Sequence, residues 1–490
     1  MMAREKKISY YDLLAEIIAR LRRINRDLYN DPAKRRSIQS NPAWKQEVEA
    51  FLCQHPQLEN YHAACMNGID EPVAEEVRDW VKDHDFFQVL ELALRLDRGI
   101  PWVEQIRLPD VYQNGERAVA ALNGNERETG VVLFPRVPSF QDDRMPSAEE
   151  AVPTRKWQSH FAPGVNQELK NVYYAPAEDL TLRGEPCRII HHILDELPVS
   201  VRKTLRVAMS PVLQDARLRK EVYARPAGKE QENLLSLHGI ENWERVKARI
   251  RAAFLEACRR AADILIFPEM LGDKAIFSES SYSAFFSELA REAEEEGLPA
   301  PYLVVGPTWW HDHHNQLYVL RGSGDYICVM EKQFSYEHRE DGQNYREDIR
   351  PGAPEIHIIH SPGLGRIAFP ICADLLYEEM RDLLIRTLHC NFMICPSFSR
   401  GKTLLTRICG EGVSRGITVV WLNSCSAVQE PPDYVGVLET PGQNVCLCPE
   451  CEGQCGADSG ACLFLSDLDL DSGTFGAVRH IRPLEAVDSA

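Results

Sequence analysis

The stretch that decides the fold covers residues 263–269 and reads Asp-Ile-Leu-Ile-Phe-Pro-Glu. A short apolar run of this kind, bounded by polar residues, is typical of a strand buried inside a layered domain. The run ends in Glu269, and a carboxylate at such a strand end is costly to bury unless it has a partner. We therefore expect a role for Glu269 at the end of a core strand.

Two later stretches repeat this pattern of an apolar run followed by a reactive side chain. Lys332 follows the apolar residues 326–330, and Cys372 follows residues 366–371. A cysteine that attacks an unreactive amide or nitrile carbon needs a group that takes its proton and a positive charge near the developing negative charge. Glu269, Lys332 and Cys372 offer a base, a cation and a thiol, in that order.

This order, the flanking residues and the strand-end placement resemble the carbon-nitrogen hydrolase (nitrilase) superfamily. The resemblance covers roughly residues 203–482, and the N-terminal region is not recognised. It implies an α/β fold, an α-β-β-α four-layer sandwich, with Glu269 as general base and Cys372 as nucleophile. Lys332, together with the backbone N–H of Ala373, would stabilise the tetrahedral intermediate.

Many members of that superfamily have a second glutamate shortly after the lysine, which positions the substrate or leaving group. Glu337, Glu340 and Glu347 all fall in this region. Of the three we favour Glu340 as the further catalytic residue. Asn315 resembles the asparagine that the family has near this strand, and we expect it to support the fold.

Helical spacing of apolar residues predicts an N-terminal, mainly helical domain over residues 1–110, with helices at 9–29, 41–54, 72–83 and 85–96. Residues 111–202 are expected to form an irregular connecting region, with a strand at 131–134 and a helix at 189–197. The resemblance implies that residues 203–482 form a nitrilase-like domain. Strands alternate with helices there, which predicts a layered domain with reactive side chains at strand ends. The expected strands are 205–213, 302–306, 316–320, 325–330, 355–360, 366–371, 391–396 and 417–422, and the expected helices are 242–262, 281–296, 375–388 and 402–415.

The net charge of the 490-residue chain is −18, which disfavours a general nucleic-acid or anionic-membrane binder, because phosphate groups would be repelled by most of the surface. No stretch approaches the roughly 20 apolar residues of a membrane helix, and no apolar signal core follows the first residues. We expect a cytoplasmic protein whose fifteen cysteines are thiols or metal ligands instead of disulfides.

Two clusters suggest metal binding. Cys446, Cys448, Cys451 and Cys455 lie in a Cys-rich insertion over residues 446–462, and their spacing suits one structural Zn²⁺; a plain loop of reduced cysteines is the alternative. Residues 311–314 read His-Asp-His-His, and we interpret them as a polar hairpin loop.

The sequence therefore predicts a cysteine-dependent hydrolase of non-peptide C–N bonds, of amidase, carbamoylase or nitrilase type, that forms a thioester intermediate. Its substrate would be a small-molecule amide, carbamoyl compound or nitrile, and no redox or nucleotide cofactor is implied. Apolar residues spread broadly over residues 375–388, so we expect a homodimer or a higher homo-oligomer. The alternative is a regulatory or scaffold protein whose nitrilase-like domain binds a ligand or oligomerises, with the N-terminal domain as effector.

Overall fold

A computed structural model of the chain describes residues 7–24, 42–60, 64, 67–100, 130–136, 169–194, 202–212, 216–227, 230–272, 279–340, 343–361, 363–399, 402–413, 416–427, 434–448 and 462–481. The chain divides into two compact units. One comprises Met1–Pro138 and Arg144–Leu180, and the other comprises Ser139–Asp143 and Thr181–Ala490. Among the described helices, none is long and apolar enough to cross a membrane.

The smaller unit consists of helices and two small antiparallel sheets. Its helices are α1 (Tyr10–Ile24), α4 (Pro42–Gln54), α5 (Pro56–Glu59), α7 (Glu71–Asp83) and α8 (Phe86–Arg98), and its paired strands are β1 (Lys7–Ile8) with β2 (Ile69–Asp70) and β3 (Val131–Pro135) with β4 (Val172–Pro176). A short 3-10 helix, η2 (Ala177–Asp179), follows β4. The buried Asp97 of α8 accepts hydrogen bonds from the backbone N–H groups of Lys170, Asn171 and Val172, which connects the helices to β4.

The larger unit is built on two sheets. In the first sheet, β8 (Thr204–Met209), β11 (Ile264–Ile266) and the start of β12 (Leu303–His311) pair in parallel. The complete order is β14-β13-β12-β11-β8-β23-β24, with β25 beside β23. The remaining strands are β13 (His314–Leu320), β14 (Tyr326–Glu331), β23 (Leu463–Asp469), β24 (Thr474–Phe475) and β25 (Arg479–Ile481).

The second sheet has the order β22-β21-β20-β19-β18-β17-β7. Its central strands are fully buried apolar segments that pair in parallel, as expected for a sheet covered on both faces. The strands are β7 (Arg188–Ile193), β17 (Glu355–Ser361), β18 (Gly365–Ala368), β19 (Phe392–Ser397), β20 (Thr418–Asn423), β21 (Gly436–Thr440) and β22 (Gln443–Cys446).

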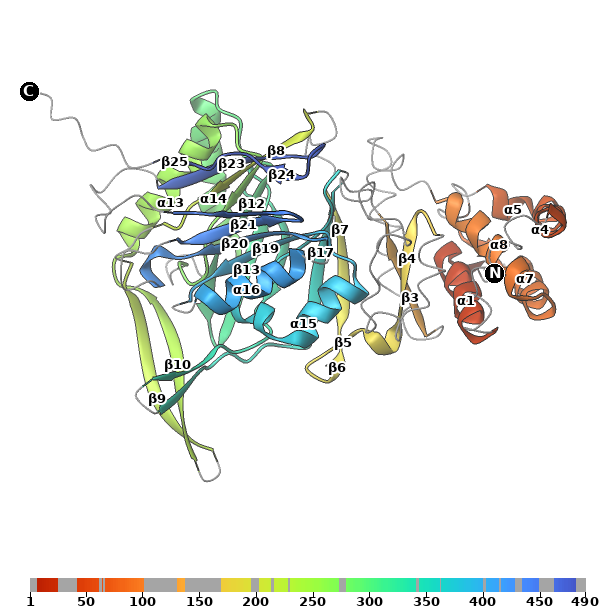
Figure 1. Cartoon of the computed structure of the whole chain (residues 1–490), viewed down its shortest axis with the longest axis horizontal. Helices are drawn as coiled ribbons and strands as arrows, with labels where there is room; N and C mark the ends of the chain where they lie inside the picture. The colour runs from red at the N-terminus through yellow and green to blue at the C-terminus, as the bar shows by residue number, and fades with distance from the viewer. Residues whose placement is uncertain are drawn as a thin grey trace, which may run out of the picture. The chain divides into compact units, whose positions relative to one another are not determined.

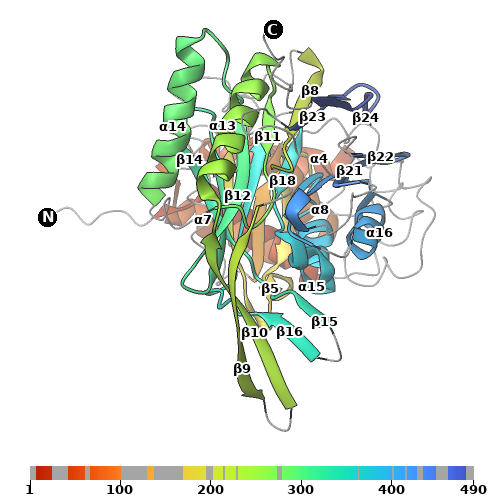
Figure 2. The ribbon, with the colours of Figure 1, turned by 90° about the vertical axis from the view of Figure 1, so that its left-hand side faces the viewer.

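Helices flank the two sheets on opposite sides (Figure 2). On one side, α13 (Trp243–Arg259) and α14 (Glu279–Glu295) share a core with the first sheet, in which Phe254 and Phe286 pack with strand residues such as Leu265. On the other side, α15 (Glu378–Asp382) and α16 (Lys402–Val413) lie along the second sheet (Figure 1). The two sheets contact each other through β12 with β19 and β14 with β17.

A four-stranded sheet with the order β15-β16-β10-β9 extends from one end of the larger unit (Figure 2). The hairpin of β9 (Leu218–Ala227) and β10 (Glu230–Ile240) forms most of it, and β15 (Glu337–Glu340) and β16 (Gln343–Glu347) complete it. No sequence pattern described above predicted the β9–β10 hairpin. β16 matters for the site because Glu347 is its last residue.

Several local expectations need correction. Residues 189–197 were expected to be helical, but β7 (Arg188–Ile193) is a strand that pairs in parallel with β17. The small hairpin of β5 (Thr181–Leu182) and β6 (Glu185–Pro186) precedes β7 and belongs to the same compact unit. The helix expected at 375–388 is interrupted, because the 3-10 helix η4 (Cys372–Leu376), α15 and the π-helix η5 (Leu383–Thr387) follow one another.

Candidate functional site

Glu269 lies three residues beyond the end of β11 and is completely buried. Its Oε1 accepts hydrogen bonds from Asn315 Nδ2 at 2.8 Å and from Lys332 Nζ at 2.7 Å. Its Oε2 accepts one from the backbone N–H of Phe398 at 2.8 Å. Phe398 follows β19 of the second sheet, so the carboxylate is held by groups from both sheets. Asn315, expected to support the fold, thus positions the candidate base.

Lys332, the residue after β14, places its ammonium between two carboxylates. Nζ lies 2.7 Å from Glu269 Oε1 and 2.7 Å from Glu347 Oε2, and the side chain has no exposed surface. Burial alone would lower the pKa of Lys332, but the charges of Glu269 and Glu347 outweigh it, and the pKa is held well above its ordinary value. Lys332 is therefore a permanent, desolvated cation.

Besides Glu269, Lys332 contacts Glu347, one of the three glutamates that the sequence left open; the role of Glu340, which we favoured, stays a prediction. Glu340 pairs with Gln343 at the end of β15, and its side chain lies outside the described residues. Glu347 is buried, and its Oε2 also accepts a hydrogen bond from the backbone N–H of Tyr336 at 2.9 Å. Burial, more than the charge of Glu269, raises the pKa of Glu347, and Lys332 opposes this shift. Sequence spacing left three glutamates open, and the parallel pairing of β16 with β10 brings the last of them to the lysine.

Cys372 begins η4, at the turn that follows β18. Its φ is 45°, in the left-handed region that residues other than glycine rarely adopt and that occurs at functional turns. The side chain is buried, and this burial raises the pKa of the thiol well above its ordinary value; the charge of Glu269 adds to the shift, and Lys332 opposes it. The neutral thiol of Cys372 is therefore favoured over the thiolate in this environment.

Asp374 ties the cysteine turn to the segment after Lys332. Its Oδ1 accepts hydrogen bonds from the backbone N–H groups of Gln333 and Phe334, both at 2.9 Å, and its Oδ2 accepts one from Ile371 at 3.0 Å. Sequence reasoning did not identify this role of Asp374, because Gln333 and Phe334 lie about forty positions earlier and no local pattern indicates them.

The two clusters considered for metal binding differ in their distance along the chain from these residues: residues 311–314 directly precede Asn315, whereas the Cys-rich insertion comes much later. The polar loop predicted at 311–314 is confirmed: His311 pairs with His314 across the β12–β13 turn, and Asp312 and His313 have positive φ. Cys446 and Cys448 are exposed, whereas Cys451 and Cys455 lie outside the described residues. The zinc prediction for this insertion stays a prediction.

Comparisons with solved structures relate part of the chain to amidases. An amidase from Nesterenkonia sp. is 18% identical, with a TM-score of 0.35, over 55% of this chain and 93% of that chain. A variant of the Nesterenkonia sp. AN1 amidase in complex with butyramide is 18% identical, with a TM-score of 0.34, over 55% of this chain and 92% of that chain. Another variant, described as an amidase from the nitrilase superfamily, is 17% identical, with a TM-score of 0.34, over 54% of this chain and 90% of that chain. No protein-family model and no curated protein matches the chain.

Proposed function

We propose that the larger unit is a cysteine-dependent hydrolase of non-peptide C–N bonds, and that its substrate is a small amide, carbamoyl compound or nitrile. The observation that carries this proposal is the buried ammonium of Lys332 beside Glu269, with a strained, buried Cys372 whose thiol is influenced by both charges. A structural ion pair alone needs no thiol at a strained turn. We retain the α-β-β-α sandwich as our interpretation of the two sheets and their flanking helices.

In the proposed reaction with an amide, Glu269 takes the proton of the Cys372 thiol while the sulfur attacks the carbonyl carbon. Lys332 and the backbone N–H of Ala373 stabilise the oxyanion. Glu269 then gives its proton to the departing ammonia or amine, which leaves a thioester on Cys372. Water attacks this thioester while Glu269 accepts a proton from the water. The C–S bond then breaks, Glu269 returns the proton to the sulfur of Cys372, and the carboxylic acid leaves.

The raised pKa of Cys372 explains why the base must be in place. A thiolate formed beforehand would be desolvated and close to the charge of Glu269, so proton transfer should accompany the attack. Asn315 and the N–H of Phe398 leave the carboxylate of Glu269 little freedom. We infer that they hold it in the orientation that proton transfer needs.

The test is selective labelling followed by turnover. Fluoroacetamide, whose acetamide moiety adds to the active-site cysteine of a Nesterenkonia amidase variant, is the probe. We expect one adduct per chain, located at Cys372 by peptide mass spectrometry, and none at the buried control Cys395. A panel of small amides should release ammonia with the wild-type chain and not with Cys372→Ala.

A scaffold protein has no need for a reactive thiol, so the same experiment separates the two hypotheses. Labelling that is spread over several cysteines, together with no ammonia release from the panel, would contradict the proposed hydrolase. Hydrolysis by Cys372→Ala at even a tenth of the wild-type rate would exclude Cys372 as the nucleophile. Circular dichroism of the variant shows whether its fold is intact.

A further inference from the structure

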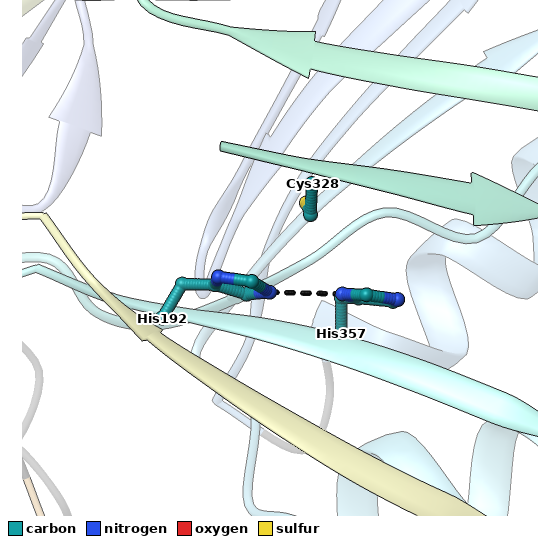
Figure 3. A group of neighbouring side chains, drawn as sticks. All are labelled: His192, Cys328 and His357. Atoms are coloured by element: carbon teal, nitrogen blue, oxygen red, sulfur yellow. Dashed lines mark hydrogen bonds between the residues drawn. The ribbon is translucent and has the colours of Figure 1, made fainter. Parts of the chain in front are cut away.

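Two histidines and a cysteine meet where the two sheets of the larger unit contact each other. His192 lies on β7 and His357 on β17, which are neighbours in the second sheet, whereas Cys328 lies on β14 of the first sheet. Figure 3 shows the imidazole rings of His192 and His357 side by side, with Cys328 facing them from the other sheet. Among the described residues, this is the one group of three or more possible metal ligands.

The distances suit a single ion. One ligand atom from each residue lies within 4.8 Å of the other two, and His192 and His357 share an N···N hydrogen bond of 2.8 Å. Tetrahedral coordination at bond lengths of about 2.0 Å to nitrogen and 2.3 Å to sulfur places ligand atoms roughly 3.3–3.5 Å apart. Metal binding would spread the two imidazole nitrogens by about 0.5 Å, bring the Cys328 sulfur closer by up to about 1.3 Å, and move the proton on His192 Nε2 to Nδ1 of the same ring.

His357 is already oriented as a ligand. Its Nε2 donates a hydrogen bond to Glu355 Oε1 at 2.9 Å, which leaves the Nδ1 lone pair directed at His192. Arg188 forms an ion pair with the other oxygen of Glu355 at 3.2 Å. A carboxylate that holds the distal N–H of a histidine is the usual second contact at zinc sites, where it fixes the tautomer and increases ligand basicity.

The surroundings favour a soft divalent ion. Cys328 and His357 are buried, and His192 is partly buried, so the group lies largely out of contact with solvent. A thiolate with two imidazoles suits Zn²⁺, whereas Mg²⁺ and Ca²⁺ prefer oxygen ligands. The thiol proton of Cys328 would be released when the metal binds.

We propose that His192, Cys328 and His357 bind one Zn²⁺, with water in the fourth position. This site is distinct from Glu269, Lys332 and Cys372 and from the Cys-rich insertion. It would link β7 and β17 of the second sheet to β14 of the first, and so stabilise the contact between the sheets. The three ligands lie far apart in the sequence, with no recognisable spacing.

The experiment uses the full chain with Cys446, Cys448, Cys451 and Cys455 all replaced by serine, which removes the thiols of the predicted Cys-rich zinc site. The protein is stripped with a chelator and titrated with Zn²⁺ and, separately, with Co²⁺. We expect the protein to bind one equivalent of either metal. Bound cobalt should show the intense visible bands of a tetrahedral ion and, separately, a charge-transfer band from the thiolate to the metal. Cys328→Ala should lose the bound equivalent and the charge-transfer band, whereas the control Cys258→Ala, which removes another buried thiol, should retain both.

A second measurement remains valid if Cys328→Ala does not fold. With the native residue at position 328, bound Zn²⁺ should protect one thiol from alkylation under mild denaturation, and peptide mapping should locate it at Cys328. No bound metal in the serine background, equal metal in Cys328→Ala, or protection of a different cysteine would each overturn the proposal. None of these readouts depends on hydrolytic activity, so a failure here leaves the proposed hydrolase standing.

Discussion

Replacement of Lys332 by methionine tests the charge arrangement of the site most directly. Methionine has a similar length and no charge, so Glu269 and Glu347 would be left buried beside each other without the cation that both contact at 2.7 Å. Breaking a buried ion pair by removal of one partner costs about 3–5 kcal/mol, because an uncompensated charge remains. At roughly 2 °C per kcal/mol for a unit of this size, the melting temperature should fall by about 6–10 °C.

The loss should depend on pH. Without Lys332, the pKa values of the two carboxyl groups in the folded state rise above their unfolded values, so the folded chain binds more protons than the unfolded chain. Stability then falls as the pH rises through that interval, and the deficit of the variant should be larger at pH 8 than at pH 5. The double variant Lys332→Met with Glu347→Gln removes one of the uncompensated charges and should recover part of the deficit.

Differential scanning fluorimetry at pH 5 and pH 8 measures these shifts for the wild-type chain and the variants. The matched control is Lys203→Met, because the ammonium of Lys203 pairs with Asp471 at 3.1 Å on the surface, where such pairs contribute about 0–1 kcal/mol. Equal melting temperatures for the Lys332 and Lys203 variants would refute the reasoning. A deficit that grows toward low pH would refute it as well.

Four further predictions follow from the site and from the sequence. Glu347→Gln removes one of the two charges that hold Lys332, and kcat for a small amide should fall by about 10²-fold while Cys372 remains open to labelling; an unchanged kcat would argue against a positioning role. Burial raises the pKa of Asp374 from 3.8 to about 7, so between these pH values the folded chain binds more protons than the unfolded chain and its stability should fall as the pH rises. Asp374→Asn should make the melting temperature less dependent on pH in this interval. Elemental analysis should find bound zinc in the wild-type chain, and the double variant Cys448→Ser with Cys451→Ser should lose it. Unchanged metal content in that variant would indicate a plain loop of reduced cysteines. Light scattering at micromolar concentration should give at least twice the chain mass of 55.7 kDa, and a monomer would defeat the predicted pairing.

Local sequence patterns predicted much of the larger unit because its strands are apolar runs and its helices have regular apolar spacing. The strands β12, β13, β14, β17, β19 and β20 and the helices α13, α14 and α16 all lie within a few residues of their expected positions. The pattern failed at β7, where Ile189 and Ile190 sit among polar residues. Its conformation depends on pairing with β17, more than 160 positions later.

The sequence by itself determined which chemistry is present: a glutamate, a lysine and a cysteine, each following a buried apolar run, and an asparagine before the lysine. Burial of those runs forces the polar residues to the strand ends, and this is a local property. Only the tertiary structure decided that Glu347 joins Lys332, that Asp374 binds the backbone after it, and that Cys328 meets His192 and His357. These contacts connect different sheets or distant strands, and no local propensity encodes the register and packing that bring the side chains together.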